Sequence, residues 1–348
     1  MSIDPARQEY YARIGAASLA PLWEVMKTLV AKEPKSAALA HCWRYADIRP
    51  FVLEAGQVIS AAEAERRVLI LENPGLPGQS RITNTLYAGL QLILPGEVAP
   101  AHRHTQSALR FVVEGSGAYT AVDGERTFMQ PGDFVITPSW TWHDHGNETA
   151  APMVWLDGLD IPIVGFFEAS FAESYSDDMQ HVARPTGDAQ ARFGEGLLPL
   201  GHTSVSKASP VFNYPYARTR EALEKLRRAQ DWDPWHGLAM RYANPLDGGW
   251  AMPTIGTWLH YLPRNFSGAP YRSTDATVFS CVEGSGKLFV FAPGGRLESF
   301  EFGPRDTFVV PSWQWRRFNA SQDCVLFAFS DRPVQEKLGL WREMRGNV

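Results

Sequence analysis

Cysteine is scarce in this chain of 348 residues, which has only Cys42, Cys281 and Cys324, far apart in the sequence. Three isolated cysteines exclude a disulfide framework and a paired-cysteine metal site, and they fit a reducing compartment. The chain also lacks a run of 18 apolar residues, and its first residues lack the basic and then apolar pattern of a signal peptide. We therefore expect a cytoplasmic protein without a membrane span.

Neither sign of charge is in large excess. The chain has 33 basic and 38 acidic residues, a formal net charge of -5 and no long basic run. These values exclude the electrostatic pattern of a protein that binds nucleic acid or an anionic membrane, and they favour a small-molecule ligand. A hydrophobic content of 45% is typical of a globular protein, and the length predicts about two domains.

The pattern of apolar residues changes along the chain. Residues 5 to about 65 are predicted to be mainly helical, with Leu19, Leu22, Trp23 and Met26 spaced as an apolar stripe. From Ile82 onward, short alternating runs separated by turn sequences predict an antiparallel sandwich or barrel. The segment 171–245 is expected to be a connector with one amphipathic helix near 219–230.

An internal repeat divides the β-rich part into two copies. The sequence Val-Glu-Gly-Ser-Gly begins at Val113 and again at Val282, and Pro-Ser-Trp-x-Trp begins at Pro138 and again at Pro311. Two matches in the same order favour a duplicated β module over chance, although a single Gly-Ser turn would not.

A histidine cluster occurs in the first copy only. His102 and His104 have the i, i+2 spacing that places two side chains on the same face of a strand, and His143 could add a third imidazole from a later strand. Three imidazoles suit a borderline transition metal and leave positions open for ligands. The alternative is an exposed polar face without a metal.

The residues around these histidines resemble the two signature motifs of the cupin superfamily, which are G-x5-H-x-H at Gly96 and G-x5-P-x4-H-x3-N at Gly132. The usual glutamate ligand after the histidine pair is missing, since Ala108 or Leu109 stands there. The resemblance therefore implies a site of three histidines. Three neutral ligands leave the ion its full charge, which attracts an anionic chelating substrate.

The longer segments 86–111 and 138–147 resemble the gentisate 1,2-dioxygenases, a family of two-cupin iron enzymes that also includes salicylate and 1-hydroxy-2-naphthoate dioxygenases. The resemblance implies an all-β bicupin with two double-stranded β-helix (jelly-roll) barrels and an N-terminal helical arm. It implies Fe(II) held by His102, His104 and His143, a homotetramer, and cleavage of gentisate by O2 between its carboxyl- and hydroxyl-bearing carbons to give maleylpyruvate. The expected domains are 1–80 for the arm, 81–170 for the metal-binding cupin, 171–245 for the connector and 246–348 for the second cupin.

The second copy does not keep the three ligands. Applying the repeat offsets to the histidines leads to Tyr271, Ser273 and Arg316. We therefore expect no catalytic metal in the C-terminal cupin, and a role for it in packing, in assembly or in shaping the first site.

Several side chains are candidates for contact with the substrate. Counting by twos from His104 reaches Arg110, a buried cation that a substrate carboxylate would satisfy, and the same parity places His145 beside His143. The alternative partner for Arg110 is Glu114 or Asp157. The resemblance implies that Arg66, Gln91 and Arg110 bind the substrate and that His145 and Asp157 act as an acid/base pair. It also places Tyr87 where salicylate-cleaving relatives have a bulkier ring, which favours gentisate.

Other functions remain open on the sequence alone. Salicylate and 1-hydroxy-2-naphthoate are alternative substrates, and three histidines also accept Mn, Co, Ni or Zn. A cupin without catalysis could simply bind an aromatic acid. The missing glutamate argues against a sugar isomerase.

Overall fold

The computed structural model describes residues 4–203, 206–291 and 295–347. The chain forms two compact units, Met1–Lys35 and Ser36–Val348. The expected arm of residues 1–80 therefore includes the whole first unit and the beginning of the second. Within the described part of the chain, each helix is too short or too polar to cross a bilayer.

The first unit consists of two helices, α1 (Pro5–Ala16) and α2 (Leu22–Leu29). The carboxylate of Asp4 accepts a hydrogen bond from the Ala6 amide and caps α1. The indole of Trp23 donates to the Tyr11 hydroxyl over 2.8 Å and joins the two helices. The predicted apolar stripe of α2 is exposed, with Leu22, Trp23 and Met26 each more than half accessible.

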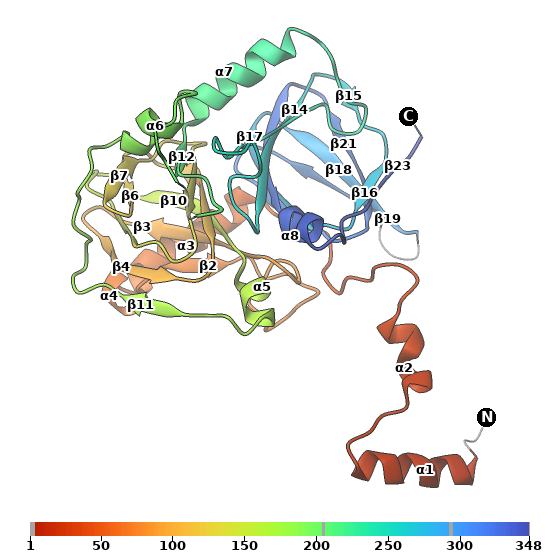
Figure 1. Ribbon diagram of the computed structural model, residues 1–348. Helices are drawn as coiled ribbons and strands as arrows, with labels where there is room; N and C mark the ends of the chain where they lie inside the picture. Colours follow the sequence, from red (N-terminus) through yellow and green to blue (C-terminus); the bar gives the residue numbers. More distant parts are fainter. Residues whose placement is uncertain (1–3, 204–205, 292–294, 348) are drawn as a thin grey trace. The chain divides into compact units, whose positions relative to one another are not determined.

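The second unit contains two barrels, and each is built from two antiparallel sheets (Figure 1). This confirms the predicted pair of β modules. In the first barrel, one sheet has the order β12-β8-β5-β10-β3-β2 and the other the order β11-β4-β9-β6-β7. The strands are β2 (Val68–Ile70), β3 (Tyr87–Ile93), β4 (Val98–His104), β5 (Ala108–Glu114), β6 (Tyr119–Val122), β7 (Glu125–Phe128), β8 (Phe134–Thr137), β9 (His143–Gly146), β10 (Met153–Leu159), β11 (Ala172–Ser174) and β12 (Asn213–Tyr214).

The second barrel repeats this arrangement with the orders β1-β20-β17-β22-β14-β13 and β19-β18-β21-β16-β23, and β15 pairs with β21. Its strands are β1 (His41–Trp43), β13 (Leu238–Arg241), β14 (Gly256–Leu262), β15 (Phe266–Ser267), β16 (Tyr271–Ser273), β17 (Thr277–Glu283), β18 (Gly286–Phe291), β19 (Leu297–Phe302), β20 (Thr307–Val310), β21 (Trp315–Ala320), β22 (Cys324–Ser330) and β23 (Glu343–Arg345). The remaining helices are α3 (Tyr45–Val58), α4 (Ala61–Ala64), α5 (Ile161–Phe166), α6 (Asp188–Phe193), α7 (Tyr216–Arg227) and α8 (Arg332–Lys337).

One cluster of buried hydrophobic residues extends across both barrels, and the second barrel has a further cluster of its own. Phe111 of the first barrel stacks on Phe327 of the second, with ring centroids 4.1 Å apart and planes 7° apart. Phe134 and Tyr242 pack around the same ring. Burial of these large rings stabilises the pair of barrels as one body, because the free energy scales with the apolar area removed from water.

The barrels also exchange edge strands. β1 precedes the first barrel in the sequence but pairs with β20 of the second, and β12 precedes the second barrel but pairs with β8 of the first. Each exchanged strand leads directly into a helix, β1 into α3 and β12 into α7, and Figure 1 shows the second of these connections. The repeat therefore extends beyond the two motifs that reveal it in the sequence, and it includes part of the expected connector.

Matching side chains at the start of α3 and α7 join the barrels. The amide of Tyr45 donates to Asp306 of the second barrel over 2.8 Å, while its hydroxyl donates to Glu114 of the first barrel over 3.0 Å. Arg49 also binds Glu114. The same contacts recur in the second copy, where the residues are Tyr216, Asp133, Glu283 and Arg220. Because Asp133 holds the Tyr216 amide, α7 begins three residues before the predicted start at 219.

We predict that Glu114→Ala lowers the free energy of unfolding by about 1–3 kcal/mol, because a buried tyrosine hydroxyl and an arginine lose their acceptor. Urea unfolding followed by circular dichroism measures this change. Glu173→Ala is the matched control, since Glu173 pairs with Arg103 at the surface and is 48% exposed. Equal effects of the two substitutions would contradict the role given to Glu114.

Candidate metal centre

Three histidines of the first barrel face one another. His102 and His104 lie on β4, His143 lies on β9, and His102 is directly paired with His143 in the sheet register. One nitrogen of each ring lies within 4.8 Å of the others. The strand spacing predicted from the i, i+2 pair therefore brings these three side chains to one point.

Backbone carbonyls orient two of the three rings. Nδ1 of His104 lies 2.8 Å from the Gln106 carbonyl, and Nδ1 of His143 lies 3.0 Å from the Thr141 carbonyl. A carbonyl can only accept, so each Nδ1 carries the proton and each Nε2 keeps a free lone pair. Such contacts fix the ring and the tautomer that a metal requires.

Burial keeps these imidazoles neutral. It lowers the pKa of His102 to about 3 and the pKa of His104 to about 4, and it holds the pKa of His143 well below the usual value. The nearby guanidinium groups of Arg66 and Arg110 lower the pKa of His102 and His104 further. At neutral pH all three rings can therefore act as metal ligands without first losing a proton.

The residues fit a divalent transition metal. Nε2 of His143 is buried and has no hydrogen-bond partner within the part of the chain that the structure describes. An unpaired buried nitrogen is costly unless something binds it. A borderline divalent cation would bind it, because three neutral imidazole nitrogens on two paired strands form a ligand set that suits such a cation.

Arg110 lies deep in the same barrel on β5 and is 4% exposed. It donates to the Thr137 hydroxyl, and its Nε lies 3.7 Å from a carboxylate oxygen of Asp157. The alternative ion pair with Asp157 is thus present, but the distance is too long for a hydrogen bond, and Nε has no hydrogen-bond partner among the described residues. The guanidinium keeps donor capacity for another anion.

Asp157 and His145 complete this group. Asp157, on β10 opposite Arg110, accepts a hydrogen bond from the Trp155 indole over 3.1 Å, and burial raises its pKa to about 6. His145 lies two residues beyond His143 and contacts the Thr120 hydroxyl through Nδ1 over 3.0 Å. Its Nε2 is buried without a hydrogen-bond partner in residues 4–203, 206–291 and 295–347.

The other predicted substrate residues lie nearby. The guanidinium of Arg66, just after α4, lies 3.1 Å from Nδ1 of His102 and donates to the Pro100 carbonyl over 2.6 Å. Tyr87 and Gln91 lie on β3, two residues on either side of Gly89, which is paired with Asp157. Residues two apart on a strand share a face, so β3 presents both side chains on the same side as Asp157.

Sequence reasoning missed the hydroxyls that hold the site in place. Thr137 accepts from Arg110, and Thr120 contacts His145. Both follow from strand register, since Thr137 lies diagonal to Arg110 across β8 and Thr120 is directly opposite His145 on β6. The motif from Gly132 to Pro138, which contains Thr137, is a signal in the sequence that could have indicated this region.

The second barrel has different residues at the corresponding positions. Tyr271 is paired with Arg316 in the sheet register, just as His102 is paired with His143. Ser273 follows Tyr271 at the spacing of His104. The side chains predicted from the repeat offsets are therefore the structural counterparts of the ligands.

Comparison with known proteins places this site in a family. A model of the cupin domain matches residues 89–159, which contain all three histidines. The chain is 56% identical to gentisate 1,2 dioxygenase 1 of Aquipseudomonas alcaligenes over 344 residues, which cover 99% of this chain and 98% of the relative. The chain belongs to the gentisate 1,2-dioxygenase family. The predicted family and the predicted bicupin fold are thereby confirmed.

Other members of the gentisate 1,2-dioxygenase family agree in sequence and in fold. A gentisate 1,2-dioxygenase of a Streptomyces species is 38% identical and covers 97% of this chain and 95% of its own length. The crystal structure of salicylate 1,2-dioxygenase from Pseudoaminobacter salicylatoxidans with gentisate has a TM-score of 0.93 at 35% identity, and the match covers 100% of this chain and 96% of that chain. Membership of the gentisate 1,2-dioxygenase family makes the chain a ring-cleaving dioxygenase, an oxidoreductase.

Proposed function

We propose that this protein is an Fe(II)-dependent dioxygenase that opens gentisate between the carbons bearing the carboxyl and hydroxyl groups and yields maleylpyruvate. The observation that carries the proposal is a buried arginine with free donor capacity, Arg110, in the same barrel as three neutral histidines. The full-length similarity to gentisate 1,2-dioxygenases supports it. In this proposal gentisate and O2 bind at one centre, so the barrel holds the two reactants close together and also places positive charge beside the substrate carboxylate.

His102, His104 and His143 would hold the iron. When bound, Fe(II) supplies open positions for the substrate and for O2 and carries electron density between them. The three neutral ligands leave the net positive charge of the ion uncompensated, so an anionic hydroxy acid is preferred over a neutral phenol. The carbonyls of Gln106 and Thr141 keep the rings of His104 and His143 in the tautomer that leaves Nε2 free to bind the metal.

Arg110 and Arg66 would bind the substrate carboxylate. Arg110 keeps an unused Nε donor, and Arg66 is near enough to His102 to contact a molecule at the metal centre. A planar guanidinium can give a carboxylate two parallel hydrogen bonds, which fix the ring in one orientation. Tyr87 and Gln91, on the face shared with Asp157, would select the substituents of the ring.

His145 and Asp157 would manage protons. The Thr120 hydroxyl donates to the Met129 sulfur, so it accepts from Nδ1 of His145 and leaves Nε2 of this neutral ring as an acceptor. Nε2 has no hydrogen-bond partner among the described residues, so it can take the proton of a substrate hydroxyl. The raised pKa of Asp157, about 6, lies close to neutral pH and allows this carboxyl to exchange a proton with its surroundings. Thr120 and Trp155 hold the two groups in position.

Dioxygen uptake by the iron-loaded protein tests this function. We expect uptake with gentisate, with one maleylpyruvate formed for each O2 consumed, as measured by its absorbance. Salicylate, 1-hydroxy-2-naphthoate and a substituted gentisate are the comparison substrates. Rapid uptake with salicylate and none with gentisate would overturn the substrate, and tight binding without uptake would overturn catalysis in favour of a binding module.

We further propose that the protein is a cytoplasmic homotetramer. The exposed apolar stripe of α2, which includes Leu22, Trp23 and Met26, supports an assembly because exposed apolar faces of this kind mark contact surfaces. The molar mass of the protein in solution, measured by light scattering, tests the number of subunits.

A further inference from the structure

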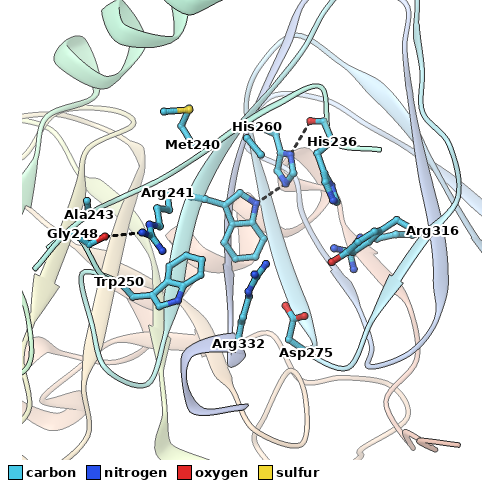
Figure 2. Close-up of a pocket in the computed structure, with 13 residues that line it drawn as sticks. His236, Met240, Arg241, Ala243, Gly248, Trp250, His260, Asp275, Arg316 and Arg332 are labelled. Atoms are coloured by element: carbon cyan, nitrogen blue, oxygen red, sulfur yellow. Dashed lines mark hydrogen bonds between the residues drawn. The ribbon is translucent and has the colours of Figure 1, made fainter. Parts of the chain in front are cut away.

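The second barrel contains a cavity of about 590 Å³ that the proposed reaction does not use. This volume is within the range of pockets that bind small organic molecules, about 300–1,000 Å³. Figure 2 shows Arg316, Asp275 and His260 toward the barrel, and Met240, Ala243 and Gly248 toward the opposite side of the cavity. The first three are buried and the last three are exposed, so the cavity leads from the surface into the barrel.

Arg316 takes the place of a metal ligand at the inner end of this cavity. It is paired with Tyr271 as His143 is paired with His102, so its guanidinium enters the barrel where the first copy directs His143. The second barrel has thus lost the ligands but keeps a positive charge at the corresponding point, now supplied by the protein itself.

Arg316 makes no ion pair and no side-chain hydrogen bond with an acidic group in the described part of the chain, although the charge of Asp275 acts on it through space. It is 5% exposed, and its guanidinium lies over two rings, 5.0 Å from the centroid of Tyr271 and 5.5 Å from that of Phe279. Asp275, the acidic residue that lines the cavity, accepts a hydrogen bond from the Trp341 indole over 2.9 Å and makes no ion pair with Arg316. A buried guanidinium without a carboxylate is costly, and an anion entering the cavity would remove that cost.

The rest of the lining is also cationic. Arg241 and Arg332 line the cavity together with Arg316, against the single carboxylate of Asp275. Arg332 has a carboxylate partner, Glu336, 2.7 Å away. His236 and His260 add no charge at neutral pH, because burial lowers the pKa of both. The cavity therefore favours an anion.

Aromatic rings make up the remaining walls. Trp250, Trp258 and Tyr271 line the cavity, and the Trp258 indole is fixed by a hydrogen bond of 2.6 Å to Nε2 of His260. His260 is fixed in turn by the His236 carbonyl, 3.1 Å from its Nδ1 (Figure 2). Rigid indoles offer flat apolar surfaces that suit a planar ring.

We propose that the C-terminal barrel is a second, non-catalytic binding site for a planar aromatic carboxylate, whose carboxylate pairs with Arg316 and whose ring lies among Trp250, Trp258 and Tyr271. This site is independent of the proposed ring-opening reaction, since it shares no residue with the metal centre. It gives the second barrel a function of its own beyond packing.

Calorimetric titration of the anaerobic, iron-loaded full chain with benzoate tests the site. We expect the wild-type chain to bind one more benzoate than Arg316→Met, or Arg316→Met to bind that benzoate roughly tenfold or more weakly, because a charged hydrogen-bonded pair is lost. Arg317→Met is the matched control, because Arg317 is the next residue of β21, points to the opposite face and stacks on Phe289. It should bind benzoate like the wild type.

Further measurements separate the possible outcomes. Ring opening of gentisate should stay within about twofold of wild type in Arg316→Met, so loss of benzoate binding with retained turnover supports the site. Acetate or cyclohexanecarboxylate binding as tightly as benzoate would overturn the requirement for a planar ring. Equal benzoate binding by the wild type and Arg316→Met would overturn the site itself.

Crystals of the wild-type protein soaked in 4-bromobenzoate provide a test that needs no variant. The anomalous signal of bromine is expected inside the second barrel, among the three aromatic side chains. Its absence there would overturn the proposal even if Arg316→Met failed to fold. Bromine in the crystal without benzoate binding in solution would show binding at crystal concentration only, which would also overturn it.

Discussion

His104→Ala is expected to lower gentisate turnover by about a thousandfold or more, because the proposed iron site would lose one of its three ligands and hold the ion less firmly. The neighbouring strand should be unaffected, since the imidazole of His104 is hydrogen-bonded to a nearby backbone carbonyl, that of Gln106, and otherwise packs against the other two histidine rings. Iron content per chain, measured after dialysis, should fall in parallel with turnover.

His181→Ala is the control for this experiment, because His181 is exposed and lies outside the cluster. It should keep both iron and turnover. Circular dichroism and thermal unfolding of both variants check the fold. If His104→Ala retained iron and activity at the level of the control, the assignment of the metal centre would be wrong.

Arg110→Met is expected to lower kcat/KM for gentisate by about a hundredfold or more, since charged hydrogen bonds contribute about 1.5–3 kcal/mol each and a carboxylate can take two from one guanidinium. Most of the loss should appear in KM if Arg110 contacts the carboxylate in the bound state as well as during reaction. Arg110→Lys should recover only part of the loss, because an ammonium cannot form the paired contact.

A structural role for Arg110 makes a different prediction. Substitution of Arg110 would remove the cation that now lies 3.7 Å from the buried Asp157 carboxylate. The pKa of Asp157, which is already raised to about 6, would then rise further. Stability would then change, and phenolic substrates that lack a carboxylate would be affected as much as gentisate. Arg126→Met is the control, since Arg126 stacks on Tyr119 and pairs with Glu148 at the surface.

Much of the fold could be predicted because the duplication is visible in short motifs. Gly115 has a φ of +86°, and a Cβ there would lie 2.6 Å from the Pro152 carbonyl, so the turn after Glu114 requires glycine. Trp140 and Trp313 both have a φ near +62° and their amides bind the strands that carry His104 and Ser273. Motifs that fix such unusual backbone persist in both copies and reveal the repeat.

The strand exchange could not be predicted, because it is a matter of which strands pair at long range. β1 has three residues and β12 has two, and neither has a periodic pattern that distinguishes it from a loop. The 5–65 segment, predicted as mainly helical, also contains β1 between its helices. Apolar spacing identified helices there but gave no information on pairing partners.

The sequence predicts which side chains of the candidate site share a face of one strand, but it does not predict which residues of neighbouring strands are paired. Parity placed His102 and His104 on one face, while His143 was added from the second motif on a later strand, and the sheet register now shows that His143 is paired with His102. The 3.7 Å contact of Arg110 with Asp157 and the bond to Thr137 depend on the register of β5 with β10 and β8, which no local pattern encodes. The Arg316 cavity needed the three-dimensional structure, since its lining combines residues that are far apart in the sequence, from His236 to Arg332.

The exchange of β1 and β12 also sets the order in which the protein can form during synthesis. β10, the last long strand of the first barrel, is synthesised well before β12. Until β12 is made, the edge of the sheet at β8 stays unpaired. β1 is made early and waits for β20, near the end of the chain. Neither barrel can therefore be completed alone, and a nascent chain arrested after residue 170 would expose an edge open to pairing with other chains.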